Sequence, residues 1–96
     1  MPYNDVTERG RTMLKDLLVK YRNAHNLSQR DMANMLGISF YYYNRMEKGL
    51  MMPGLQARRK IALGFRILPE TLIKFLNGEL TLDEIFQQIE FARVVY

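Results

Sequence analysis

Residues 27–49 read LSQRDMANMLGISFYYYNRMEKG, and this stretch decides the fold. Apolar residues recur in it at the three- and four-residue spacing of an amphipathic helix, in two short segments. Each segment is preceded by a serine, the residue type that caps helices by accepting a hydrogen bond from a backbone N–H. Ser28 stands before the first segment, with Asp31 placed to complete a capping box, and Ser39 stands before the second. The stretch therefore predicts two consecutive short helices.

A glycine turn joins these two helices into one unit. Gly37 lies between them, where the chain must turn sharply and where a positive φ is expected, and Gly49 lies where the second helix should stop. Ala33 is small at a position where the helices must approach each other closely. The inward-facing positions are predicted to be Met32, Ala33, Leu36, Tyr43 and Met46. Two short helices with a small contact residue and a glycine turn are typical of a DNA-binding helix-turn-helix.

The rest of the chain predicts further helices and no strands. Asp5 reads as the start of a first helix that continues to about His25, with Asn26 ending it in a left-handed conformation. Later helices are expected to begin at residues 53–54, at Pro69 and after Thr81, where Glu84 completes a second capping box. The sequence therefore predicts an all-α protein of six helices.

Charge is distributed unevenly along the 96 residues. The chain carries a net charge of +4, but residues 1–66 hold 12 basic and 5 acidic residues, whereas residues 67–96 hold 2 basic and 5 acidic ones. A polyanion would therefore be attracted to the first two-thirds and repelled by the end. Together with the motif, this makes nucleic acid the expected partner, since Lys and Arg contacts to phosphates supply most non-specific DNA affinity.

The residues that catalysis or metal binding requires are scarce. The single histidine, His25, is expected at a helix end, and Asp83 and Glu84 lie in the first turn of a predicted helix, where carboxylates are electrostatically favoured. The chain has no cysteine, no Gly-rich phosphate loop and no metal-ligand spacing. Ninety-six residues also leave little room for an active-site cleft. We therefore expect no enzymatic activity, no metal and no cofactor.

The same stretch resembles the helix-turn-helix of the phage lambda Cro/cI repressor class, also called the XRE class. The resemblance rests on Leu27-Ser28-Gln29, Ala33, Leu36-Gly37-Ile38-Ser39 and Arg45-Met46-Glu47-x-Gly49, and it extends outward to cover roughly residues 14–76. It implies a lambda-repressor-like DNA-binding domain of five helices, expected over residues 1–78, followed by a sixth, C-terminal helix. It also implies a salt bridge between Arg22 and Glu47 that holds the second motif helix at its docking angle.

The expected DNA-reading surface differs from that of typical class members, which carry Arg, Gln, Ser or Thr where this chain has Phe40-Tyr41-Tyr42. Phe40 and Tyr41 can contact thymine methyl groups, whereas Asn44 and Arg45 offer hydrogen bonds to adenine or guanine. Tyr42 is open to either a DNA contact or core packing. The predicted DNA-binding residues are Gln29, Arg30, Ser39, Phe40, Tyr41, Tyr42, Asn44, Arg45 and Lys48, with Gln29 and Lys48 expected at phosphates.

Two apolar segments suggest protein partners. Leu50, Met51 and Met52 stand where relatives usually carry a basic residue, and they favour an alternative in which the motif binds protein instead of DNA. Residues 79–96 are expected to form a dimerisation element that makes the protein a homodimer. The alternative is that this helix folds back on the first and fifth helices of its own chain. The predicted dimer contacts are Ile85, Phe86, Ile89, Val94 and Tyr96.

The resemblance implies a sequence-specific transcriptional regulator that binds double-stranded DNA, with repression of a bacterial or mobile-element promoter as the expected activity. A close alternative is the antitoxin of a toxin–antitoxin pair that regulates its own operon. No uncharged stretch reaches the ~20 residues that a membrane-spanning helix needs. The N-terminus also lacks the basic and apolar regions of a signal peptide. We therefore expect a soluble protein of the bacterial cytoplasm, associated with the nucleoid and not with a membrane.

Overall fold

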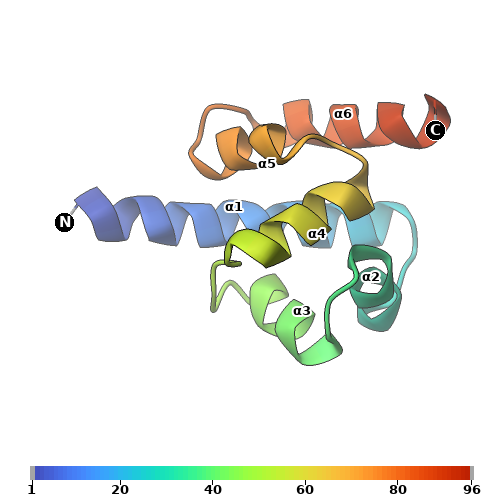
Figure 1. Ribbon diagram of the computed structural model, residues 1–96, viewed down its shortest axis with the longest axis horizontal. Coiled ribbons are helices and arrows are strands. Elements are labelled where there is room, and N and C mark those ends of the chain that lie inside the picture. The colour runs from blue at the N-terminus through green and yellow to red at the C-terminus, as the bar shows by residue number, and fades with distance from the viewer. Residues whose placement is uncertain (1, 96) are drawn as a thin grey trace.

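The computed structural model describes the backbone of residues 2–95 and the side chains of residues 8–95. This part of the chain is all-helical, as the sequence predicts, with six helices and no strand (Figure 1). The helices are α1 (Pro2–Ala24), α2 (Gln29–Leu36), α3 (Phe40–Glu47), α4 (Leu55–Phe65), α5 (Pro69–Leu76) and α6 (Leu82–Val95).

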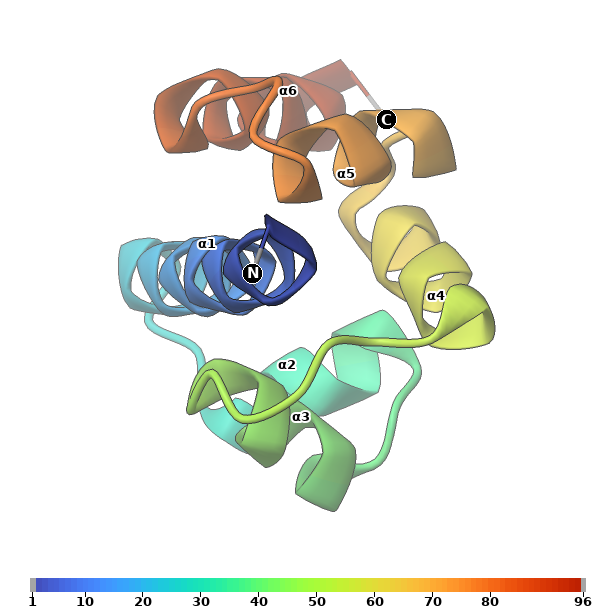
Figure 2. The ribbon, with the colours of Figure 1, turned by 90° about the vertical axis from the view of Figure 1, so that its left-hand side faces the viewer.

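The long helix α1 forms the middle layer of the molecule. Figures 1 and 2 show α5 and α6 on one side of it and α2 and α3 on the other, with α4 connecting the two sides. Leu14, Leu17 and Leu18 of α1 are completely buried, and α1 packs against α3 on one side and against α5 and α6 on the other. One continuous core therefore ties the helix-turn-helix, formed by α2 and α3, to the C-terminal pair.

The predicted helix boundaries are largely confirmed. The Ser28 hydroxyl accepts from the Asp31 N–H at 3.0 Å, and the Asp31 carboxylate accepts from the Ser28 N–H at 3.0 Å, which completes the capping box. The equivalent box at Thr81 and Glu84 opens α6. Gly37 turns the chain at φ +70°, a conformation that favours glycine. The predicted start of α1 at Asp5 is wrong, since the helix begins at Pro2, a residue that the first turn tolerates.

The sequence does not predict one close approach, which lies between α4 and α2. A Cβ atom on Gly64 of α4 would lie 2.8 Å from the backbone oxygen of Met35 and 2.8 Å from a methyl carbon of Leu36, both on α2. Only glycine at this position allows α4 to pack so tightly against the helix-turn-helix. An isolated glycine within a helical pattern carries no mark in the sequence that distinguishes such a contact from a tolerated one.

The position of α6 corrects part of the dimerisation prediction. Ile85 and Ile89 are completely buried within this chain, where α6 packs on α1 and α5, so they cannot form a dimer interface. Phe86 is half-buried, with the Lys20 ammonium 4.8 Å from the centre of its ring. Val94 is 87% exposed and remains available to a partner. Tyr96 lies outside the described residues. The alternative, that the helix folds back on its own chain, therefore holds for the buried face of α6.

None of the helices in residues 2–95 combines the length and the apolar character that crossing a membrane would require.

Candidate nucleic-acid interface

A salt bridge fixes α3 against α1, between the two residues that the family resemblance implies. The Arg22 guanidinium donates from Nε to Glu47 Oε2 at 3.0 Å and from Nη2 to Glu47 Oε1 at 2.8 Å. Glu47 is only 7% exposed, and it also accepts a hydrogen bond from the buried hydroxyl of Tyr43. Two parallel bonds between a guanidinium and a carboxylate are directional, so they set the orientation of α3 as well as its distance from α1.

The surroundings of Glu47 keep it ionised. Burial by itself raises the pKa of this carboxyl, but hydrogen bonds from Arg22, Tyr43 and Gln29 outweigh that effect and lower the pKa below its ordinary value. Burial raises the pKa of Tyr43, and the neighbouring carboxylate raises it further. The pair is therefore held as a carboxylate and a protonated phenol, which is the combination that the hydrogen bond between them requires.

The hydrogen-bond network continues from Glu47 to the surface of the motif. Gln29 Nε2 donates to Glu47 Oε1 at 3.1 Å, and Asn44 Nδ2 donates to Gln29 Oε1 at 3.1 Å. Gln29 opens α2 and Asn44 lies on α3, so this chain of amides joins the two helices. Sequence reasoning assigned Gln29 to phosphates and Asn44 to bases, but it did not find that their amides are hydrogen-bonded to each other.

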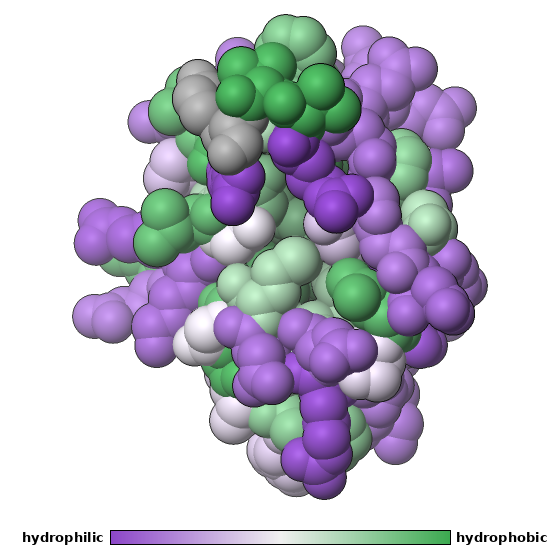
Figure 3. All heavy atoms as spheres, turned by 90° about the vertical axis from the view of Figure 1, so that its right-hand side faces the viewer, coloured by the Kyte–Doolittle hydropathy of each residue, from purple (hydrophilic) through white to green (hydrophobic). Residues whose placement is uncertain are grey.

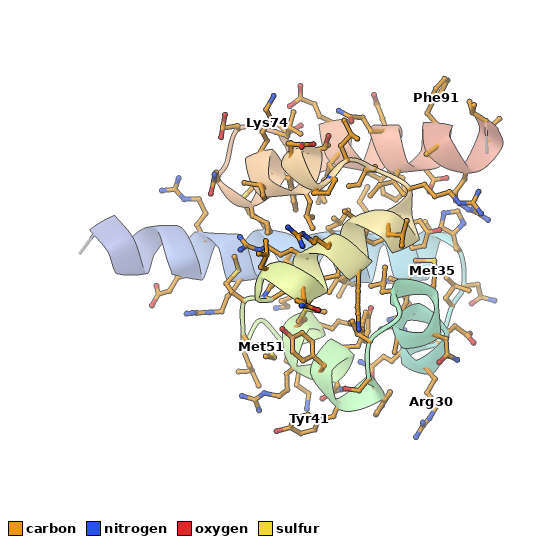
Figure 4. The ribbon with its side chains drawn as sticks, in the orientation of Figure 1. Arg30, Met35, Tyr41, Met51, Lys74 and Phe91 are labelled. Carbon is orange, nitrogen blue, oxygen red and sulfur yellow. The ribbon has the colours of Figure 1, made fainter. Side chains whose placement is uncertain are left out.

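The exposed start of α3 carries two aromatic side chains, each beside an arginine. Phe40 is 37% exposed, and the guanidinium carbon of Arg30 lies 4.4 Å from the centre of its ring. Tyr41 is 70% exposed, and the guanidinium carbon of Arg45 lies 5.7 Å from its ring centre. Figure 4 shows Arg30 and Tyr41 projecting from the same end of the molecule, away from α1. Four predicted site residues therefore form one aromatic and basic surface.

Ser39 and Tyr42 connect this surface to the rest of the fold. The Ser39 hydroxyl accepts from the Tyr42 N–H at 3.1 Å and so caps α3, as predicted. The Tyr42 ring is half-buried against the core, and its hydroxyl accepts from the Gly54 N–H at 3.3 Å. Tyr42 therefore has a packing role, because this side chain joins α3 to the start of α4, and its contact with DNA stays a prediction.

Comparison with known proteins identifies the family. Residues 18–72, more than half of the chain, match the family model described as helix-turn-helix. The chain belongs to the XRE, or Cro/cI-like, helix-turn-helix family. It is also 36% identical over 66 residues to a protein of Methanocaldococcus jannaschii named as an uncharacterized HTH-type transcriptional regulator. That alignment covers 69% of this chain and all of the relative. No solved structure matches the chain.

In this XRE-family chain, the loop after α3 is less exposed than its sequence suggests. Leu50 is 56% exposed, but Met51 and Met52 are half-buried and pack against the core. Of the three apolar residues predicted to meet a protein partner, Leu50 is therefore the most exposed, and the partner itself stays a prediction. Lys48, at the end of α3, is exposed beside the loop.

The only histidine of the chain lies away from this surface. His25, after the end of α1, hydrogen-bonds through Nε2 to Glu90 at 2.5 Å and accepts at Nδ1 from Arg93 at 2.8 Å. Both partners belong to α6. The described residues hold no group of three His, Cys, Asp or Glu side chains placed to bind a metal ion.

Proposed function

We propose that this protein is a transcriptional regulator that inserts α3 into the DNA major groove in a sequence-specific way and represses a promoter. The observation that carries the proposal is the surface of α3, where aromatic and basic side chains project from a helix whose orientation is fixed by a buried salt bridge. Membership of the XRE family supports it, and so does the name of the relative as an HTH-type transcriptional regulator.

Cations around α3 are suited to positioning the DNA backbone. Arg30, from α2, and Lys48, at the end of α3, are both exposed. A surface hollow of about 480 Å³ lies between Ser39, Tyr42 and the start of α4, with Lys60 in its lining. No side chain caps α4, so its first N–H groups are available to a phosphate. These groups supply affinity that does not depend on sequence.

A binding titration at several salt concentrations tests this proposal. Mixed-sequence DNA should bind with a steep dependence on salt, because each neutralised phosphate releases counterions. Lys48→Ala should weaken all sequences alike and reduce the salt slope by about one unit. Selection from random DNA should then recover a preferred site. Binding that is independent of salt, or its complete absence, would contradict the proposed function.

We further propose that the regulator acts as a homodimer through the exposed end of α6. Phe91, Val94 and Val95 are 68%, 87% and 53% exposed, and Leu68, before α5, is 67% exposed. Figure 3 shows hydrophobic side chains gathered at the top of this face, where α6 ends. Phe91 and Leu68 line the same surface hollow of about 560 Å³. A twofold pairing would present two copies of α3 about 34 Å apart and favour a palindromic site.

Point variants test the dimer better than truncation does, because removing α6 would expose the core that Ile85 and Ile89 fill. Phe91→Asp and Val94→Asp place a charge in the proposed interface, whereas Thr12→Asp places one on an exposed position of α1. Sedimentation should show a dimer for the unchanged protein and for Thr12→Asp, and a monomer for the two interface variants. A monomeric unchanged protein at high concentration would overturn this part of the proposal.

A further inference from the structure

The polar groups at the start of α3 are already engaged within the fold. The Ser39 hydroxyl accepts the capping hydrogen bond from the Tyr42 N–H, and the Tyr42 hydroxyl accepts from the Gly54 N–H. The Asn44 amide nitrogen donates to Gln29. Ser39 and Tyr42 each keep a hydroxyl hydrogen, and Asn44 keeps one amide hydrogen and its carbonyl oxygen, so these groups can still contact a base, but only in the orientation that their existing hydrogen bonds fix. Side chains of α3 whose orientation is not fixed in this way are better placed to follow a base.

Tyr41 and Arg45 are the pair that meets this condition. They are four residues apart on α3, which places them on the same face of the helix. Tyr41 is 70% exposed, and the Arg45 guanidinium lies beside its ring at 5.7 Å. Arg45 forms no salt bridge with any side chain of residues 8–95. Its hydrogen-bond donors are therefore available to a ligand, while the ring beside it restricts where the guanidinium can go.

We propose that Tyr41 reads the 5-methyl group of a thymine and that Arg45 reads a guanine next to it. This assignment rests on the proposed function and names the DNA that the regulator recognises. In the major groove only thymine presents a methyl group, and guanine presents two acceptors, O6 and N7, that suit a guanidinium. An exposed ring with an arginine beside it offers an apolar surface to the first base and paired donors to the second.

Phe40 has a secondary part in this assignment. Its ring is only 37% exposed, and Arg30 lies closer to it, at 4.4 Å, than Arg45 does to Tyr41. Arg30 belongs to α2, whose start faces the DNA backbone in the proposed complex. Phe40 is therefore a positioning residue, which holds Arg30 toward a phosphate and is not the reader of the methyl group.

Base analogues that add or remove the methyl group test the assignment directly. In a site obtained by selection from random DNA, each thymine is replaced in turn by deoxyuridine, which lacks only the methyl. One position per half-site should lose affinity about fourfold, the equivalent of one buried methyl(ene) group. Placing cytosine at that position should also weaken binding, and 5-methylcytosine should recover about fourfold relative to cytosine.

Variants of the pair connect the effect to its residues. Tyr41→Ala should bind the thymine and deoxyuridine sites equally, whereas Tyr41→Phe and Phe40→Ala should keep the difference. Arg45→Ala should lose the preference for guanine at the neighbouring position. Because Tyr41 is exposed, its substitution should leave thermal unfolding unchanged, which excludes misfolding as the cause.

The outcomes separate this assignment from the proposed function. If no DNA binds at any salt concentration, the proposed function fails and this assignment fails with it. If DNA binds but sites with thymine and with deoxyuridine bind equally at every position, the proposed function is retained and the assignment of the methyl group to Tyr41 is overturned. A methyl effect that persists in Tyr41→Ala would likewise overturn it, because another residue would then be the reader.

Discussion

The two layers on either side of α1 are held in place by different kinds of interaction. The α2–α3 layer is positioned by directed contacts, which are the Arg22–Glu47 salt bridge, the amides of Gln29 and Asn44, and the close approach at Gly64. The α5–α6 layer is positioned mainly by apolar burial. Directed contacts specify an angle, whereas apolar burial tolerates small shifts. The layer that contains α3, the proposed reading helix, is thus the one whose orientation is most tightly specified.

The C-terminal layer illustrates the second kind of interaction. Ile85, Ile89 and Ala92 of α6 are buried against the core, and the polar contacts between α6 and α1 lie at the periphery. These contacts are the Lys20–Asp83 pair at 4.0 Å and the hydrogen bonds of His25 with Glu90 and Arg93. The Lys20–Asp83 and His25–Arg93 contacts are exposed and contribute little to stability, whereas the His25–Glu90 contact is partly buried. We therefore expect substitutions in the α2–α3 layer to disturb the orientation of α3, and substitutions at the periphery of the α5–α6 layer to leave that orientation unchanged.

The largest effect is expected from Arg22→Met, which leaves Glu47 buried without its cation. The cost should be about 3 kcal/mol, at the lower end of the range for broken buried pairs because Arg22 is partly exposed. The double variant Arg22→Met/Glu47→Gln should recover more than half of that loss, since a neutral Gln can still accept from Tyr43. Chemical denaturation measures both values.

DNA affinity supplies the second readout for this pair. The double variant should remain weak in DNA binding although its stability recovers, because the directed bonds that orient α3 are gone. A double variant with normal DNA affinity would show that apolar packing alone orients α3, and it would remove the contrast between the two layers.

The next largest effect is expected from Gly64→Ala. The added methyl group would meet the Met35 backbone oxygen, which cannot move without shifting α2, so a loss of about 1–3 kcal/mol is expected. The neighbouring Leu63 is 78% exposed, and Leu63→Ala should change stability by less than about 0.5 kcal/mol. Thermal unfolding of the two variants provides the comparison. Equal melting temperatures would mean that the contact between α2 and α4 has room to adjust.

Acid should weaken the α2–α3 layer through Glu47. The pKa of this carboxyl is lowered in the folded chain by its hydrogen-bond donors, so folding favours the ionised form. That stabilisation is complete above the ordinary value of 4.5 and is lost as the pH falls through the lower folded pKa. Glu47→Gln cannot lose it, so the stability deficit of this variant relative to the unchanged protein should narrow as the pH falls from 4.5 to the folded pKa of Glu47. Denaturation curves across the acid range measure the deficit, and a constant one would contradict the assignment.

Sequence reasoning predicted the helix-turn-helix region well for a physical reason. Capping residues such as Ser28 and Ser39 and a turn glycine such as Gly37 act through their own backbone neighbours, so their roles can be recognised locally. The pairing of Arg22 with Glu47 spans 25 residues, and only the resemblance to a known family predicted it. Gly64 carries no comparable signal, because its role depends on which helix lies against it.

The C-terminal region was harder to predict for the opposite reason. The apolar stripe through Ile85 and Ile89 shows that one face of α6 is covered, but a stripe does not specify whether the same chain or a second copy covers it. The hydrogen bond from Asn44 to Gln29 could not be predicted from the sequence either, because a side-chain amide can hydrogen-bond to a base and to another amide equally well. Long-range packing decides which chain covers this face of α6 and brings Asn44 to Gln29, and it is encoded in the whole chain, not in any one segment.

The smallest effect is expected from His25→Phe, which tests whether the two layers are independent. A phenyl ring can keep the contact with Tyr21, whose ring centre lies 4.4 Å from that of His25, but it loses the bonds to Glu90 and Arg93. Because Arg93 is exposed and Glu90 partly so, water can replace both bonds, and the loss should be about 0.5–1 kcal/mol. Hydrogen exchange should quicken at the end of α6 and stay unchanged in α3, with DNA affinity per binding site unaltered. Faster exchange in α3 as well would mean that α1 transmits the change between the layers, and the orientation of α3 would then depend on the C-terminal pair.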